Sequence, residues 1–249
     1  METEKISFYN DREKLISGRI YRGVKKSHRG LIFSHGLFST KDGYKITRLA
    51  ESIVDAGYIL LTFDFSFSGE SEGHISDISI LQEVEDLKCA VKFFQNYGIT
   101  DLHLMGSSMG GVVTLLYTSA NIENLKSVIA IATPVDLRKT IFRNIEVEQI
   151  DVLQDDALVM LHNIPVKNKF FKEIRKIDMT GAVKKIYIPV LIIHGENDEV
   201  VDVSNAHLLK EILHESELVI IKNGDHSLNK MVYIEIIRKN IIPWLGKMK

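Results

Sequence analysis

Six short runs of apolar, β-prone residues recur along the chain and most constrain how it can fold. They cover residues 31–33, 59–63, 102–105, 128–131, 190–193 and 218–221. Apolar and polar residues barely alternate within them, which is typical of strands buried on both faces in a parallel sheet covered by helices. Helical patterns occur between and after the runs, at residues 81–94, 109–120, 203–213 and 229–242. This order predicts a doubly wound α/β domain with a mostly parallel central sheet flanked by helices.

Two segments depart from this alternation. The first 22 residues carry alternating apolar and polar positions, which predict an antiparallel hairpin at the sheet edge. Residues 135–185 separate the fourth and fifth runs, although a simple crossover needs only about a dozen residues. We therefore expect a core domain of residues 1–134 and 186–249, with residues 135–185 inserted after the fourth parallel strand as a helical cap. A second small domain or a plain long crossover is the alternative.

The inserted segment contains aromatic residues that look exposed in the sequence. With two aliphatic residues they either line an apolar pocket or form a small core of the cap itself, and the second role is favoured for most of them. The five residues are Phe142, Leu158, Met160, Phe170 and Phe171.

Composition excludes several classes of protein. A formal net charge of -2, with basic residues scattered, gives no footprint for nucleic acid. The apolar runs are too short for a membrane span, and the polar N-terminus does not resemble a signal peptide. The single cysteine, Cys89, is interpreted as a small buried hydrophobe and suits a reducing compartment. No zinc-type spacing of Cys and His appears. These features predict a cytoplasmic protein without a metal or organic cofactor.

The sequence Gly106-Ser107-Ser108-Met109-Gly110 fits a Gly-x-Ser-x-Gly turn between a strand and a helix. Such a turn exposes a serine that a neighbouring base can activate. A buried run ends at Met105 and a helical pattern follows. A second match, centred on Ser71, lacks both, and Glu70 and Glu72 would oppose a developing oxyanion. We therefore predict Ser108 as the nucleophile and interpret Ser71 as a loop residue.

The base and the acid should follow the nucleophile in loops at the carboxyl ends of strands. His226 follows the last run and is the predicted base. His207 and His214 fall on a helical pattern, His162 falls in the cap, and His194 ends a strand, where it could be a buried polar residue.

The acid that orients the imidazole should come from the loop after residues 190–193. Asp198 is the predicted acid. Glu196, Asp202 and, after the fourth run, Asp136 are fallbacks.

Five motifs in this order resemble those of the α/β-hydrolase superfamily, and the likeness covers nearly the whole chain. They are Ser34-His35-Gly36-Leu37, residues 63–73, residues 106–111, His194-Gly195-Glu196-Asn197-Asp198 and Gly224-Asp225-His226. The resemblance implies an α/β-hydrolase fold and an oxyanion hole formed by the backbone N–H groups of Leu37 and Met109.

Within the superfamily, the chain looks most like small carboxylesterases, including feruloyl (cinnamoyl) esterases and monoacylglycerol lipases. The resemblance implies a carboxylesterase that cleaves a small-molecule ester through an acyl-enzyme. The sequence departs from the usual pattern at Phe67, Ser68 and Ser107, which bears on the substrate rather than on the order of the triad.

Three alternatives stay open. A thioesterase or a peptidase would share the same triad, and a non-catalytic ligand-binding protein would share the same fold. Ser108 argues against a dehalogenase, which would use an aspartate. The oligomeric state is also open, a homodimer included.

Overall fold

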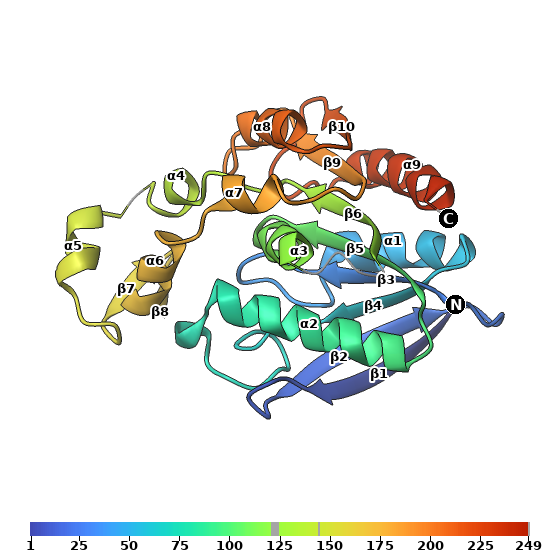
Figure 1. The fold of residues 1–249 in the computed structure, drawn as a ribbon, viewed down its shortest axis with the longest axis horizontal. Coiled ribbons are helices and arrows are strands. Elements are labelled where there is room, and N and C mark those ends of the chain that lie inside the picture. The colour runs from blue at the N-terminus through green and yellow to red at the C-terminus, as the bar shows by residue number, and fades with distance from the viewer. Residues whose placement is uncertain (121–124, 144, 249) are drawn as a thin grey trace.

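The computed structural model describes residues 1–120, 125–143 and 145–248. An eight-stranded sheet forms its centre, in the order β1-β2-β4-β3-β5-β6-β9-β10 (Figure 1). Neighbouring strands from β4 to β10 are parallel, whereas β1 and β2 pair with each other, and β2 pairs with β4, in antiparallel fashion. The strands are β1 Glu2–Tyr9, β2 Leu15–Arg22, β3 Arg29–Ser34, β4 Ile59–Phe63, β5 Asp101–Ser107, β6 Leu125–Ile131, β9 Val190–Gly195 and β10 Ser216–Ile221.

The six parallel strands coincide with the six apolar runs, and the N-terminal hairpin lies at the sheet edge as predicted. Every residue of β4 and of β9 is buried. A strand covered on both faces has no solvated side, and for this reason its sequence does not alternate. The mostly parallel sheet of the sequence-based prediction is confirmed.

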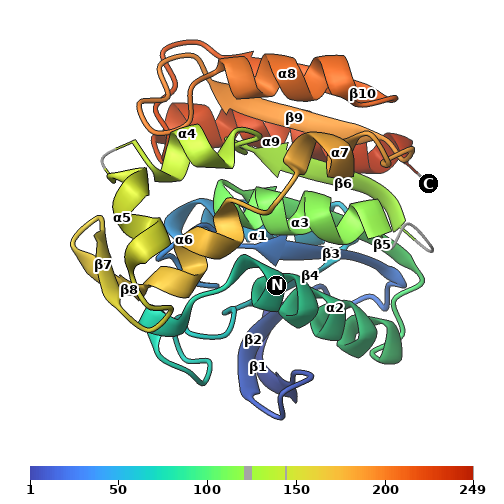
Figure 2. The same ribbon diagram turned by 60° about the vertical axis from the view of Figure 1, so that its left-hand side comes forward.

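Helices cover both faces of this sheet (Figure 2). On one face α2 (Ile80–Asn96), α3 (Met109–Ala120) and α8 (Ser204–Ile212) pack on strand residues such as Leu104 and Val128. On the other face α1 (Tyr44–Asp55) and α9 (Met231–Lys247) pack on the alternate residues, such as Met105 and Ile129. The sheet therefore separates two apolar cores, and its strand ends are left free to carry functional loops.

Two helices differ from the sequence-based expectation. Helix α1 was not predicted, although Ile46, Leu49 and Ile53 form its buried stripe. Helix α9 continues past residue 242, through Pro243, to Lys247. Proline removes one helical hydrogen bond, but burial of Trp244 and Leu245 on the second core accompanies the extra turn.

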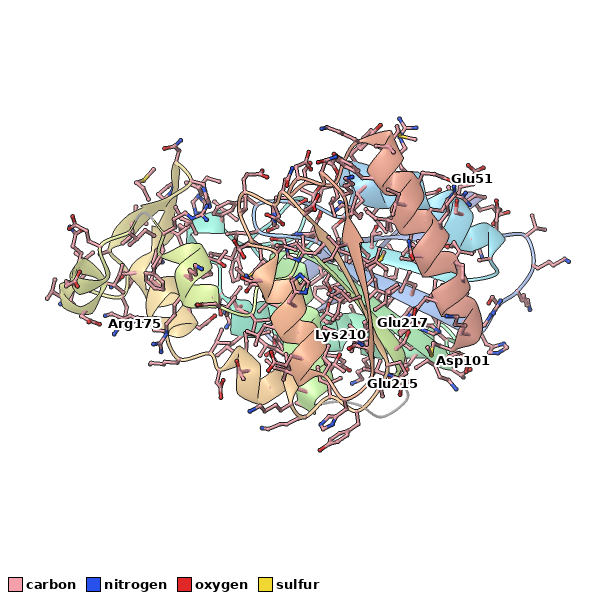
Figure 3. All side chains as sticks on the ribbon, turned by 90° about the horizontal axis from the view of Figure 1, so that it is seen from above. Glu51, Asp101, Arg175, Lys210, Glu215 and Glu217 are labelled. Carbon is pink, nitrogen blue, oxygen red and sulfur yellow. The ribbon has the colours of Figure 1, made fainter. Side chains whose placement is uncertain are left out.

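The part of residues 135–185 from α4 to α6 projects beyond the strand ends, at the left of Figure 1, whereas α7 lies against α3 and α8; Arg175 marks the segment in Figure 3. Position 144 lies outside the described residues. The segment contains four short helices and a β-hairpin. The sequence analysis predicted helices here but not the hairpin. Its elements are α4 Leu137–Ile141, α5 Val147–Val152, β7 Leu158–Leu161, β8 Ile164–Lys167, α6 Asn168–Ile174 and α7 Met179–Val183.

The aromatic side chains of this segment join the core on the α2–α3 face of the sheet rather than forming an exposed surface or a separate core. Phe170 and Phe171 are fully buried and meet edge to face, and Phe142 packs against Phe171. Their exposed appearance in the sequence was misleading, because helix α6 turns both rings inward. Leu158 and Met160 are exposed on β7.

Within the described residues, no helix is long and apolar enough to cross a lipid bilayer. The same residues contain no group of three or more His, Cys, Asp and Glu side chains placed to hold a metal ion.

Candidate active site

Ser108 occupies a sharp turn between β5 and α3. Its φ angle is 54°, a left-handed conformation that non-glycine residues rarely adopt. Its backbone N–H donates to the Ile131 carbonyl at 2.8 Å, and its carbonyl accepts from the Gly111 N–H at 2.9 Å. These bonds fix the turn, which brings the hydroxyl to the carboxyl end of the sheet.

Glycines allow the backbone to close around this turn. A Cβ on Gly106 would lie 2.3 Å from the carbonyl oxygen of Gly110, and one on Gly110 would lie 2.2 Å from that of Ser34. Because both obstacles are backbone atoms, neither can move aside as a side chain would. The turn therefore depends on glycine at both positions.

We expect Gly110→Ala to destabilise the protein by about 3 kcal/mol, because its methyl group would force β3 and the start of α3 apart. Urea unfolding followed by circular dichroism measures this loss. Gly246→Ala is the matched control, since a Cβ at Gly246 meets nothing within 4 Å. Because Gly246 is an exposed position in a helix, the Gly246→Ala variant should gain about 0.5–1 kcal/mol of stability. Equal stability of the two variants would contradict the packing argument.

The structure brings the three residues of the predicted triad together. His226 lies in the loop between β10 and α9, and its Nε2 is 3.0 Å from Ser108 Oγ. Its Nδ1 is 2.8 Å from Asp198 Oδ2 and 3.0 Å from Oδ1. A continuous chain of hydrogen bonds therefore joins a buried carboxylate to the serine hydroxyl.

Several donors hold the Asp198 carboxylate. Its Oδ1 accepts the backbone N–H groups of Val200 at 2.9 Å and Val201 at 2.7 Å, and His194 Nε2 lies 3.2 Å from Oδ2. Burial opposes ionisation of this carboxyl, but the hydrogen bonds from His194 and His226 outweigh it and hold its pKa well below the usual range. Asp198 is therefore a fixed negative charge beside the imidazole.

The fallback acids are engaged elsewhere. Glu196 accepts the Asn223 N–H at 3.0 Å. Asp202 accepts the Ser204 N–H, and Asp136 accepts the Lys139 N–H at the start of α4, each at 2.9 Å. Their carboxylates complete turns and helix ends rather than meeting the imidazole.

The loop after β3 lies against the serine. A Cβ on Gly36 would be 3.3 Å from Ser108 Cβ, so the backbone that leads to Leu37 passes beside the hydroxyl. His35 braces this loop: its Nε2 accepts the Phe65 N–H at 3.1 Å, and its Nδ1 lies 2.9 Å from the Gly36 carbonyl. Burial lowers the pKa of His35, which favours the neutral ring that this bonding needs. Met109 lies across the turn, at the first position of α3.

Most of the remaining candidates lie where the sequence placed them, but His214 lies beyond the end of α8 and Cys89 is less buried than predicted. Ser71 is a buried loop residue whose hydroxyl donates to the Asp64 carbonyl at 2.7 Å. His194 is buried at the end of β9, and its Nε2 lies 2.8 Å from the Val201 carbonyl. His162, His207 and His214 are exposed. Cys89 is only partly buried and packs at the edge of the first core.

Sequence reasoning missed one charged residue of the site. A pocket of about 220 Å³ opens beside Ser108 and His226, and Lys45 of α1 lines it together with Leu37 and Ser107. Lys45 is buried, and its Nζ donates to Ser107 Oγ at 3.1 Å. A signal existed in the sequence: Lys45 precedes Leu49 by one helical turn and so lies on the apolar stripe of the helix.

The sheet order, the strand-to-helix turn at Ser108 and the surrounding loops define an α/β-hydrolase fold. Residues 25–149, half of the chain, match the family described as "Serine aminopeptidase, S33". The chain belongs to this family of α/β hydrolases and is a hydrolase.

Known proteins of several activities are similar to this chain. "Palmitoyl-protein thioesterase ABHD10, mitochondrial" from Mus musculus is 24% identical over 98% of this chain and 83% of its own length. "Quorum-quenching protein AidA" from Acinetobacter baumannii is 33% identical, over 40% of this chain and 34% of its own length. Neither likeness fixes a substrate.

Solved structures show the same fold. Est1E from Butyrivibrio proteoclasticus, with ferulic acid bound, superposes with a TM-score of 0.88 over 98% of each chain, at 19% identity. Mouse ABHD10 superposes with a TM-score of 0.83 over 99% of this chain and all of its own, at 21% identity.

Proposed function

We propose that this chain is a serine esterase that cleaves short carboxylic esters through an acyl-enzyme, with Ser108 as nucleophile, His226 as base and Asp198 as the orienting acid. The single observation that carries the proposal is the unbroken relay from Asp198 through His226 to Ser108, with links of 2.8 Å and 3.0 Å. A hydroxyl within hydrogen-bond reach of a base that is itself held by a carboxylate is the arrangement that serine catalysis needs.

During acylation one proton moves from Ser108 to His226 and then from His226 to the leaving alcohol. Ser108 Oγ attacks the ester carbonyl while His226 Nε2 accepts its proton, and Asp198 stabilises the resulting imidazolium. The tetrahedral intermediate then collapses, and its carbon–oxygen bond to the leaving alcohol breaks. His226 returns the proton to that alcohol. Water then attacks the acyl-enzyme while His226 accepts one of its protons. The second tetrahedral intermediate collapses as His226 gives that proton to Ser108 Oγ, which releases the acid and the free serine.

The oxyanion of both intermediates needs donors close to Ser108. We assign this role to the backbone N–H groups of Leu37 and Met109, on the loop that Gly36 brings against the serine and at the first position of α3. The positive end of the α3 dipole adds to their effect. One such donor contributes about 3–4 kcal/mol to lowering the barrier.

The size of the pocket supports a short substrate. Its volume of about 220 Å³ lies below the range of about 300–1,000 Å³ usual for drug-sized ligands. Thioester cleavage is the second candidate, because a relative that matches almost the whole chain is named a palmitoyl-protein thioesterase. A thioester would use the same relay, with a thiol as leaving group.

A substrate panel tests the proposal. p-Nitrophenyl esters of rising acyl length, acyl thioesters of matched length and aminoacyl amides are compared by kcat/KM. We expect the short esters to be cleaved best, with activity falling as the acyl chain outgrows the pocket. A preference for thioesters would favour the second candidate. A preference for amides would indicate a peptidase, and no turnover of any class would indicate a non-catalytic binding protein.

We also propose that residues 135–185 act as a cap on a core of residues 1–134 and 186–249. The segment contacts the acid loop, because Arg143 donates to the Glu199 carbonyl at 2.6 Å and the Glu199 carboxylate accepts the His226 N–H at 3.2 Å. Its buried Phe170 and Phe171 belong to the same apolar core as Leu87 of α2 and Val113 of α3, so the segment packs onto the sheet domain. A cap connected in this way would shape access to the serine.

A reducing compartment such as the cytoplasm would suit the single free cysteine. The pocket beside Ser108 and His226 is of a size that supports a small-molecule substrate. The homodimer stays a prediction.

A further inference from the structure

Two buried lysines lie four positions apart after β3, and their surroundings differ. Lys41 Nζ meets carboxylate oxygens of Asp64 and Glu70, each at 2.7 Å. Lys45 Nζ instead meets one neutral group, the Ser107 hydroxyl at 3.1 Å. Within the described part of the chain, no carboxylate lies within ion-pair distance of Lys45. The charge of Lys41 is balanced by the fold, whereas the charge of Lys45 is not.

The carboxylates that influence Lys45 have other partners. Asp198 is held by His226, His194 and two backbone N–H groups. Asp225 accepts the Leu228 N–H at 2.8 Å and the Ser227 hydroxyl at 2.9 Å. Both act on Lys45 only through space, and burial outweighs them, lowering the pKa of Lys45 to about 8. The amine is therefore mostly a cation at neutral pH. Among the residues that the structure describes, one of its three N–H groups has an acceptor, Ser107 Oγ, which leaves two donors for a ligand.

A buried cation without a counter-ion costs stability. Lysine is rarely buried unless it is paired. Lys45 also lines the same pocket as Ser108 and His226, beside the proposed nucleophile. Its position and its missing counter-ion are both explained if the substrate supplies the anion.

We propose that Lys45 is a specificity-determining residue that binds a carboxylate carried by the substrate, so that the preferred substrates are short esters with a free carboxylate on the acyl or the alcohol part. This inference rests on the proposed esterase function and names the substrate class of the same site. The carboxylate accepts hydrogen bonds from Nζ, and charge-assisted bonds of this kind are about twice as strong as neutral ones.

Matched ester pairs test the proposal. The acyl series compares the p-nitrophenyl monoester of adipic acid with the p-nitrophenyl ester of its methyl half-ester. The alcohol series compares 4-acetoxybenzoate with 4-acetoxybenzamide. After subtraction of the rate in buffer, we expect wild type to prefer the carboxylate substrate in one of the two series by about tenfold or more in kcat/KM, mainly through KM.

Lys45→Met should abolish this preference: kcat/KM should fall more for the carboxylate substrate than for its neutral partner, so that the ratio of the two approaches one. Lys45→Arg should retain part of the preference. Lys26→Met, which removes an exposed lysine, is the matched control and should keep all of it. A structural lysine would destabilise the fold when removed, but Lys45→Met should raise the melting temperature by about 2–6 °C, because it removes an unpaired buried charge.

Failure of this inference differs from failure of the esterase proposal. If wild type cleaves neutral esters but prefers the carboxylate in neither series, or if Lys45→Met keeps the preference, the role of Lys45 is overturned. If no ester is cleaved, the esterase proposal fails, and binding decides the role of Lys45. In that case 4-hydroxybenzoate should raise the melting temperature of wild type more than 4-hydroxybenzamide does, and Lys45→Met should lose the difference. Equal shifts in wild type would overturn the inference.

Discussion

Ser108→Ala is expected to lower kcat for a short p-nitrophenyl ester by about five to six orders of magnitude. The substitution removes one non-hydrogen atom, the hydroxyl oxygen Oγ, which lies 3.0 Å from His226 Nε2. Without it no acyl-enzyme can form, and only stabilisation of the oxyanion and binding remain to accelerate attack by water. Steady-state kinetics with a highly purified protein measure the residual rate, and the melting temperature reports whether the fold is intact.

Ser71→Ala is the matched control, because it alters the other Gly-x-Ser-x-Gly sequence of the chain. Its hydroxyl accepts the Ser17 N–H at 2.9 Å and donates to the Asp64 carbonyl. The variant should lose about 1 kcal/mol of stability and keep its kcat. Wild-type turnover by Ser108→Ala, or loss of turnover confined to Ser71→Ala, would contradict the assignment of the nucleophile.

Asp198→Asn should lower kcat by about four orders of magnitude while the protein stays folded. The amide has nearly the same shape, but it cannot balance the charge of an imidazolium. Its NH₂ group can also turn toward Nδ1 and stabilise the wrong tautomer of His226. The carboxylate lies 2.8 Å from that nitrogen. The effect should appear in kcat for every ester tested, since the acid acts on the base and not on the substrate.

Asp202→Asn controls for the loss of one acidic group in the same loop. Its carboxylate accepts the N–H of Ser204, the first residue of α8, a role that asparagine also fulfils. Its kcat should stay within about twofold of wild type. Near-normal turnover by Asp198→Asn, together with a large loss in Asp202→Asn, Glu196→Gln or Asp136→Asn, would move the role of the acid to that residue.

Much of the fold was predictable because its strands are encoded locally. Strands β4 and β9 are mostly apolar and do not alternate with polar residues, and only a sheet covered on both faces buries such strands completely. The turn at Ser108 was also predictable from local sequence, because the close approach of its backbone requires glycine at positions 106 and 110, and both glycines are present.

The proximity of the candidate triad was predictable from topology. Parallel strands end at one edge of a sheet, so loops after β5, β9 and β10 must lie near one another. The choice among the acids was less certain from sequence, because Glu196, Asp198 and Asp202 occupy one loop. Only the folded backbone shows which carboxylate meets the imidazole.

Other features depend on tertiary contacts that no local pattern reports. The β7–β8 hairpin turns through His162 and Asn163, both with positive φ, and its strands are only four residues each. Such short strands give too little alternation to predict. Lys45 was overlooked because a lysine at the start of a helix usually faces solvent. Its burial follows from how α1 packs beside the turn at Ser108, where Nζ reaches Ser107.

The central claim is that Ser108 is an activated nucleophile, and covalent labelling tests it most directly. Wild type and Ser108→Ala are treated with a fluorophosphonate, and intact mass and peptide mass spectrometry locate the adduct. We predict a single adduct per chain on Ser108, no adduct on Ser108→Ala, and much slower labelling of His226→Ala. An unlabelled wild type, or an adduct that persists elsewhere in Ser108→Ala, would contradict the claim.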